Sequence, residues 1–139
     1  EGGGATSLGS AIQSLNRMAR RSRLVVIISD FRGPRDWSSA LVELAGRHSV
    51  IAVEIQDPRE QEIPDVGELW LVDPETGRQL RVDTRSKKLR ERFANAAVQD
   101  RAEVAGMLAR AGAQHVVPST RGDWLPTLAG FLNAKGTAR

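Results

Sequence analysis

The hydrophobic and polar positions along the chain follow two rhythms, one typical of helices and one typical of strands. Residues 7–20 place apolar side chains at helical spacing, and the run Leu24–Ser29 that follows begins with five consecutive apolar residues. A second helical pattern over residues 37–47 leads into an apolar strand pattern over residues 50–55. Strands that are apolar on both faces belong to sheets that are covered on both faces. The alternation of helix and strand therefore predicts an α/β fold with a parallel sheet.

The rhythm changes in the middle of the chain, where two short alternating segments replace the long apolar runs. These segments are Glu68–Val72 and Gln79–Asp83, and the sequence between them carries Pro74 early and Gly77 late. Proline and glycine in those places are typical of the loop of a β-hairpin. The pattern therefore predicts a hairpin inserted into the α/β succession.

The last part of the chain returns to the first rhythm. A long helical pattern over residues 86–111 precedes a strand pattern over residues 114–118, and a closing helix is expected over residues 123–134. We find no internal repeat and no linker that would divide the chain. The sequence thus predicts one domain over residues 1–134 and a disordered tail over residues 135–139.

Composition narrows the class of protein without naming an activity. The chain of 139 residues has a net charge of +3, and its basic and acidic residues are interleaved. A mild excess of this kind is not the footprint of a nucleic-acid-binding protein. The chain has no cysteine, and no apolar run approaches the roughly 20 residues of a membrane helix. We therefore expect a cytoplasmic location with no membrane contact from this segment, and because the chain opens on Glu1 we interpret it as a fragment of a longer protein.

Polar residues follow the predicted strands at the points where the strands end. Ser29 and Asp30 end the first strand, Asp57 follows the second, and residues 119–120 are a serine and a threonine after the third. Because crossovers between parallel strands are right-handed, the first helix should start at this same edge, which places Thr6 beside Asp30. Ligands of open α/β sheets bind at the carboxyl ends of the strands.

Two interpretations of this edge stay open. A hydroxyl beside a carboxylate offers oxygen ligands to Mg²⁺, so Thr6 and Asp30 are candidate metal ligands. Aspartates at strand ends also cap the next turn through their own backbone, which is the alternative for Asp30 and, more strongly, for Asp57 before a proline.

Four other residues complete the candidates. Trp70 lies on the predicted hairpin and is either its packing anchor or an exposed contact for a partner, and Arg32 is a second candidate partner contact. His48 and His115 have no companions in the sequence that would make a zinc or nucleophile site, so we interpret both as packing residues.

An ordered series of motifs resembles a known family. The segment 3–8 before a helix, together with residues 24–31, resembles the second half of a von Willebrand factor A-like domain. Residues 47–53, 57–64 and 73–77 are similar to segments of a bacterial family known as domain of unknown function fifty-eight. The resemblance covers nearly the whole chain.

The resemblance implies a Rossmann-like sheet of strand order 3-2-1-4-5-6, of which this chain supplies the 4-5-6 half with a β-hairpin insertion. It also implies a metal-ion-dependent adhesion site to which Thr6 and Asp30 contribute, with an Asp-x-Ser-x-Ser motif that this chain lacks. Mg²⁺ binding is thus expected in an intact protein rather than in this chain. Relatives of this kind resemble partners of MoxR-type AAA+ ATPases in chaperone-like assembly.

Two functions follow as expectations. The first is a non-enzymatic protein-interaction module, metal-assisted in the intact protein, and the second is a metal-dependent phosphodiester or phosphoester hydrolase that uses Asp30 and Asp57. The strand Leu24–Ser29 should also have an edge that this chain leaves unpaired, which predicts marginal stability, repacking or self-association of the chain.

Overall fold

The protein is described by a computed structural model, which covers residues 7–73 and 76–118 together with residues 126, 129–130 and 132–133. The chain falls into two compact units. Residues 1–56 and 103–139 make the first unit, and residues 57–102 make the second. The single domain expected over residues 1–134 therefore stays a prediction.

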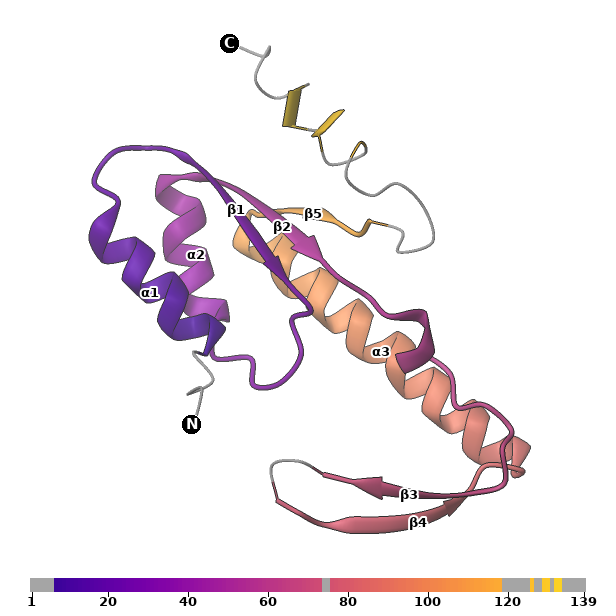
Figure 1. Ribbon diagram of the computed structural model, residues 1–139. Coiled ribbons are helices and arrows are strands. Elements are labelled where there is room, and N and C mark those ends of the chain that lie inside the picture. The colour runs from indigo at the N-terminus through magenta and orange to yellow at the C-terminus, as the bar shows by residue number, and fades with distance from the viewer. Residues whose placement is uncertain (1–6, 74–75, 119–125, 127–128, 131, 134–139) are drawn as a thin grey trace. The chain divides into compact units, whose positions relative to one another are not determined.

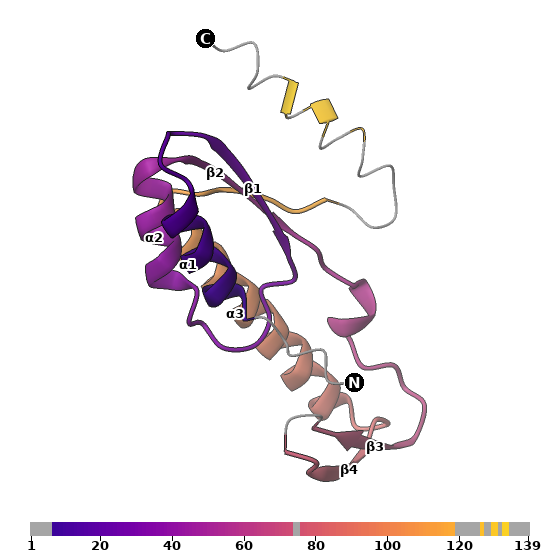
Figure 2. The same cartoon turned by 60° about the vertical axis from the view of Figure 1, so that its left-hand side comes forward.

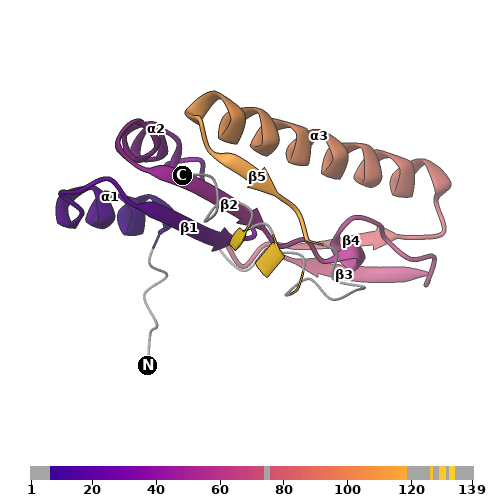
Figure 3. The same ribbon diagram turned by 90° about the horizontal axis from the view of Figure 1, so that it is seen from above.

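A parallel sheet of three strands forms the centre of the first unit (Figures 1 and 3). Its strands are β1 (Leu24–Ser29), β2 (Ser49–Glu54) and β5 (Gln114–Val116), in the order β1-β2-β5. The register pairs Val26 with Ile51 and Ser29 with Glu54. The predicted parallel α/β sheet is confirmed, and β1 has the predicted bounds.

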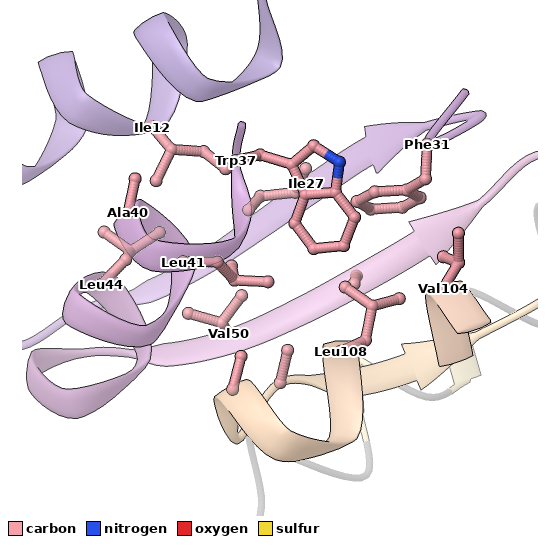
Figure 4. Close-up of a cluster of buried hydrophobic side chains, with 13 residues drawn as sticks. Ile12, Ile27, Phe31, Trp37, Ala40, Leu41, Leu44, Val50, Val104 and Leu108 are labelled. Carbon is pink, nitrogen blue, oxygen red and sulfur yellow. The ribbon is translucent and has the colours of Figure 1, made fainter. Parts of the chain in front are cut away.

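Helices cover one face of this sheet. They are α1 (Leu8–Met18), α2 (Ser38–Arg47) and the end of α3 (Lys87–Ala111), whose residues from position 103 onward belong to this unit. Right-handed crossovers from β1 to β2 and from β2 to β5 place α2 and α3 on the same side, and Ile12 of α1 packs into the same cluster. Figure 4 shows the apolar side chains that meet there. The buried cluster consists of Ile12, Ile27, Phe31, Trp37, Ala40, Leu41, Leu44, Val50, Ala52, Val104, Leu108, Ala111 and Ala113.

The first helix begins at the carboxyl edge of the sheet. Ser7 caps α1, since its Oγ accepts a hydrogen bond from the Ser10 N–H at 3.1 Å. In the first turn of the helix, a Cβ on Gly9 would lie 3.0 Å from Cγ of Asp36, in the loop that follows β1. The start of α1 and the loop after β1 are therefore neighbours, as the crossover argument requires. Thr6 itself lies outside the described residues.

The opposite face of the sheet is covered unevenly. Ile51 and Val53 of β2 are buried there, packed against Val116 and Leu132. The β1 residues on the same face are exposed, at 48% for Leu24, 37% for Val26 and 58% for Ile28. β1 also lies at the end of the strand order, so none of the described strands pairs with its outer edge. The expectation that this strand is covered on both faces is therefore wrong for the described chain.

The second unit contains the hairpin (Figure 2). A single 3₁₀ turn, η1 (Pro58–Glu60), precedes the antiparallel strands β3 (Glu68–Val72) and β4 (Gln79–Asp83), whose bounds match the prediction. Gly77 adopts a left-handed φ of 70°, and its N–H donates to the Asp73 carbonyl at 2.8 Å. Glycine takes this conformation at little cost, which explains its place late in the loop.

One threonine holds the base of the hairpin together. Thr84 is fully buried, and its hydroxyl donates to the Gly67 carbonyl at 2.5 Å while it accepts from the Val66 N–H at 3.0 Å. The Thr84 carbonyl in turn accepts from the Arg90 guanidinium at 2.6 Å. These bonds join the entry and the exit of the hairpin to the first turn of α3.

Candidate functional site

The carboxyl edge of the three-stranded sheet brings together side chains from all three strands. Ser29 and Glu54 are the last residues of β1 and β2 and pair in register. His115 lies on β5, on the other side of β2, where it pairs with Ala52. Because residues two apart share a face, Glu54 and His115 both lie on the helix-covered side.

Asp30 follows β1 as an exposed side chain that caps its own turn. Its Oδ1 accepts a hydrogen bond from the Arg32 N–H at 3.0 Å, two residues ahead. The preceding Ser29 repeats the pattern, with its Oγ accepting from the Phe31 N–H at 3.0 Å. Of the two interpretations of Asp30, the turn is the one whose hydrogen bond the structure shows.

Phe31 fixes the loop that carries Asp30. Its φ of 52° is left-handed, an uncommon conformation for a large side chain. The ring is 1% exposed and meets the ring of Trp37 edge to face, with a centroid separation of 5.3 Å. The Arg35 guanidinium donates to the Phe31 carbonyl at 2.5 Å. Aromatic packing and hydrogen bonds thus offset the backbone strain and set the direction of the loop.

The described residues at this edge do not by themselves fit a Mg²⁺ site. Across residues 7–73, 76–118 and the few described beyond them, no three His, Cys, Asp or Glu side chains gather as metal ligands would. Asp30 is an exposed carboxylate at this edge, and a single carboxylate gives Mg²⁺ little affinity. Thr6, the other predicted ligand, lies outside the described residues.

Asp57, the second acid of the hydrolase hypothesis, caps a turn as well. Its Oδ1 accepts from the Arg59 N–H at 2.9 Å at the start of η1, and its carboxylate lies 3.3 Å from the Arg59 guanidinium. This is the turn interpretation that the following proline favoured.

A buried pair at the same edge escaped the sequence analysis. His115 Nε2 lies 2.6 Å from Glu54 Oε2, and the Glu54 side chain is 4% exposed. The interpretation of His115 as a packing residue did not include this contact, in which the imidazole holds the carboxyl group of the central strand. The signal that could have found the pair is the acid Glu54 within an otherwise apolar strand, since a buried acid needs a hydrogen-bond partner.

His48 fits the packing interpretation. It is 6% exposed, and its Nδ1 accepts from the Arg23 N–H at 3.1 Å. This bond ties the end of α2 to the start of β1.

The predicted partner contacts are both exposed. Trp70 on β3 is 64% exposed, so its interpretation as the packing anchor of the hairpin is wrong. It lies opposite Arg81 in the register, and Arg81 forms an ion pair with Glu68. Arg32 is exposed in the loop after β1.

At the end of β4, the Arg85 guanidinium lies 2.9 Å from the Asp83 carboxylate and lowers the pKa of that carboxyl group.

Within the described residues, no helix is both long enough and apolar enough to cross a membrane.

Comparison with known proteins gives one family. Residues 2–103 match the family described as "Protein of unknown function DUF58". Over 130 residues, 92% of the chain, the sequence is 41% identical to an uncharacterized protein of Mycobacterium avium and covers 75% of it. It is 42% identical over 130 residues to an uncharacterized protein of Mycobacterium tuberculosis, of which it spans only 40%. No solved structure matches the chain.

Proposed function

We propose that this chain, which belongs to the DUF58 family, is part of a non-enzymatic protein-interaction module. The observation that carries the proposal is the exposed apolar surface of the hairpin. Trp70 and Val72, on one face of β3, are 64% and 58% exposed. Tryptophan is enriched among the residues that dominate binding energy at protein interfaces, and large exposed apolar patches mark interaction sites.

The sheet supports a second part of the proposal, namely that the chain is the second half of a Rossmann-like, von Willebrand A-type domain. Three parallel strands in the order β1-β2-β5, with α1, α2 and the end of α3 on one face, have the arrangement expected for the 4-5-6 half. In an intact protein an upstream strand would pair with the outer edge of β1, and helices of the upstream half would cover Val26 and Ile28 on the other face of the sheet. The resemblance implies a Mg²⁺-assisted rim at the carboxyl edge of the sheet, for which Thr6 and Asp30 would need further ligands from outside the described residues.

The proposed partner is a MoxR-type AAA+ ATPase. This part rests on the resemblance of the motifs, and the hairpin is the surface that we assign to the contact. The hydrolase hypothesis requires several acids that converge on one metal site, and the described residues contain no such group.

The test measures capture of a purified MoxR-type ATPase by the immobilised chain. Trp70→Ala should weaken binding by about 30-fold, the effect of losing an interface residue worth about 2 kcal/mol. Val42→Ala is the matched control, because Val42 is also apolar and is 53% exposed on α2. Equal affinities of the chain and of Trp70→Ala would contradict the proposal.

The same preparation separates the hydrolase from the module. Added Mg²⁺ or Mn²⁺ should give no turnover of a phosphodiester substrate. Turnover that Asp30→Ala abolishes would instead support the metal-dependent hydrolase. Asp30→Asn is the control for the turn, since an asparagine side chain still accepts the hydrogen bond from the Arg32 N–H.

A further inference from the structure

The second face of the hairpin differs from the face that carries Trp70. The register pairs Leu69 with Val82 and Leu71 with Leu80, and directly opposed residues point to the same side. This face is thus apolar along its whole length. Burial decreases toward the loop, where Leu71 and Leu80 are 42% and 62% exposed.

A surface hollow opens at this end of the hairpin. Its volume is about 450 Å³, within the range of sites that bind ligands. Leu71, Val72, Gln79 and Leu80 line it, with Asp73 and Arg78 at the loop. All of these residues belong to the second unit.

The two charged residues at the rim of the hollow, Asp73 and Arg78, differ in the interactions that they form. Asp73 accepts a hydrogen bond from the Thr76 hydroxyl at 2.7 Å through its Oδ2. Arg78 is exposed, and within the described part of the chain its guanidinium forms no ion pair. Arg78 directly precedes β4 and lines the hollow together with Leu71 and Leu80. An arginine beside an apolar floor favours a ligand that combines apolar groups with a carboxylate.

We infer that this face binds an extended segment of a partner protein in which apolar residues at alternate positions are followed, two residues later, by an acid. Side chains of an added strand alternate in direction with a period of two, which matches the spacing from Val82 to Leu80 on β4 and from Leu80 to Arg78, directly before the strand. Among the described strands, β3 and β4 pair only with each other, so each has an outer edge to which such a segment adds. The inference rests on the proposed interaction function and names the chemistry of the partner.

The experiment uses two acetylated peptides, one containing Leu-Thr-Leu-Thr-Glu and the other Leu-Thr-Leu-Thr-Lys. Each is titrated into the isotope-labelled full chain, and binding is followed by amide NMR shifts. We expect the glutamate peptide to bind at least tenfold more tightly than the lysine peptide. The shifts should centre on residues 71–73 and 78–80.

Two charge-reversal variants complete the design. Arg78→Glu should invert the preference between the peptides, whereas Arg92→Glu, an exposed arginine on α3, should leave it unchanged. Equal binding of the two peptides, no binding of either, or shifts that centre elsewhere would overturn the inference. The peptides contain no ATPase sequence, so a failure of ATPase capture and a failure of this inference are separate results.

Discussion

Glu54 is the more deeply buried member of its pair with His115, with 4% of its side chain exposed against 21% for the imidazole. The pair joins the last residue of β2 to β5 across 61 positions of sequence. Because Glu54 has little access to water, it depends on His115 more than His115 depends on it. An unpaired buried acid costs more than a partly exposed imidazole that water can solvate.

This asymmetry predicts unequal effects of the two single substitutions. His115→Ala leaves the carboxyl group without its partner and should lower the free energy of unfolding by about 3 kcal/mol. Glu54→Gln keeps an acceptor for the imidazole and should cost about 1 kcal/mol. Urea denaturation followed by circular dichroism measures both. A larger loss for Glu54→Gln than for His115→Ala would show that the pair does not stabilise β2 in this way.

The left-handed backbone at Phe31 predicts an unusual order of substitutions. Phe31→Ala and Phe31→Gly both lose the buried ring, at a cost of about 3–5 kcal/mol. Glycine adopts the observed φ of 52° without strain, so Phe31→Gly should be more stable than Phe31→Ala by about 1 kcal/mol.

Phe93 provides the control for this prediction, because it lies within α3, where glycine is unfavourable. There Phe93→Gly should be less stable than Phe93→Ala by about 1 kcal/mol. Thermal melts or urea titrations of the four variants give the comparison. The same order at both positions would mean that the backbone of Phe31 is not strained.

The hydrogen bonds of Thr84 predict a large effect from a small change. Thr84→Val keeps the shape of the side chain but leaves the Val66 N–H without its acceptor. It also removes the hydrogen bond from the hydroxyl to the Gly67 carbonyl. The expected loss is about 2–3 kcal/mol, whereas Thr84→Ser, which keeps the hydroxyl, should lose less than about 1 kcal/mol.

Amide exchange gives this prediction a local measurement. The Val66 amide should exchange faster in Thr84→Val than in Thr84→Ser, while the Thr84 amide, which donates to the Gly67 carbonyl at 2.9 Å, stays protected. Equal protection of Val66 in both variants would contradict the role assigned to the hydroxyl.

Local patterns predicted the strands well because each strand carries its own signal. The apolar run of β1 and the alternation of β3 and β4, separated by Pro74 and Gly77, were enough to give the bounds that the structure shows. The sequence did not predict the Glu54–His115 pair, since no local pattern links residues on separate strands. Alternation of apolar and polar residues does not tell which face of a hairpin is covered by other groups. It therefore leaves both interpretations of Trp70 open, and the 64% exposure of this residue decides between them.

The position of the candidate site was predicted from the sequence, but the role of its residues was not. The sequence placed Asp30 at the carboxyl edge because strand ends and crossover handedness are general rules. The structure adds the hydrogen bond to the Arg32 N–H, which depends on the conformation of three residues. A polar residue at a strand end is therefore located by topology, but its role is decided by the loop that holds it.

The exposed face and outer edge of β1 predict that the chain associates with itself. Leu24, Val26 and Ile28 are exposed on a strand at the end of the sheet, and apolar edge strands pair readily with other chains. Sedimentation velocity should therefore show a mass that rises with concentration. Ile28→Lys should shift the chain toward monomer, because a charged residue on an edge strand opposes pairing. Val42→Lys, at a residue 53% exposed on α2, should not change the association. A chain that stays monomeric at all concentrations, or an equal response to both lysines, would show that β1 is not the surface of association.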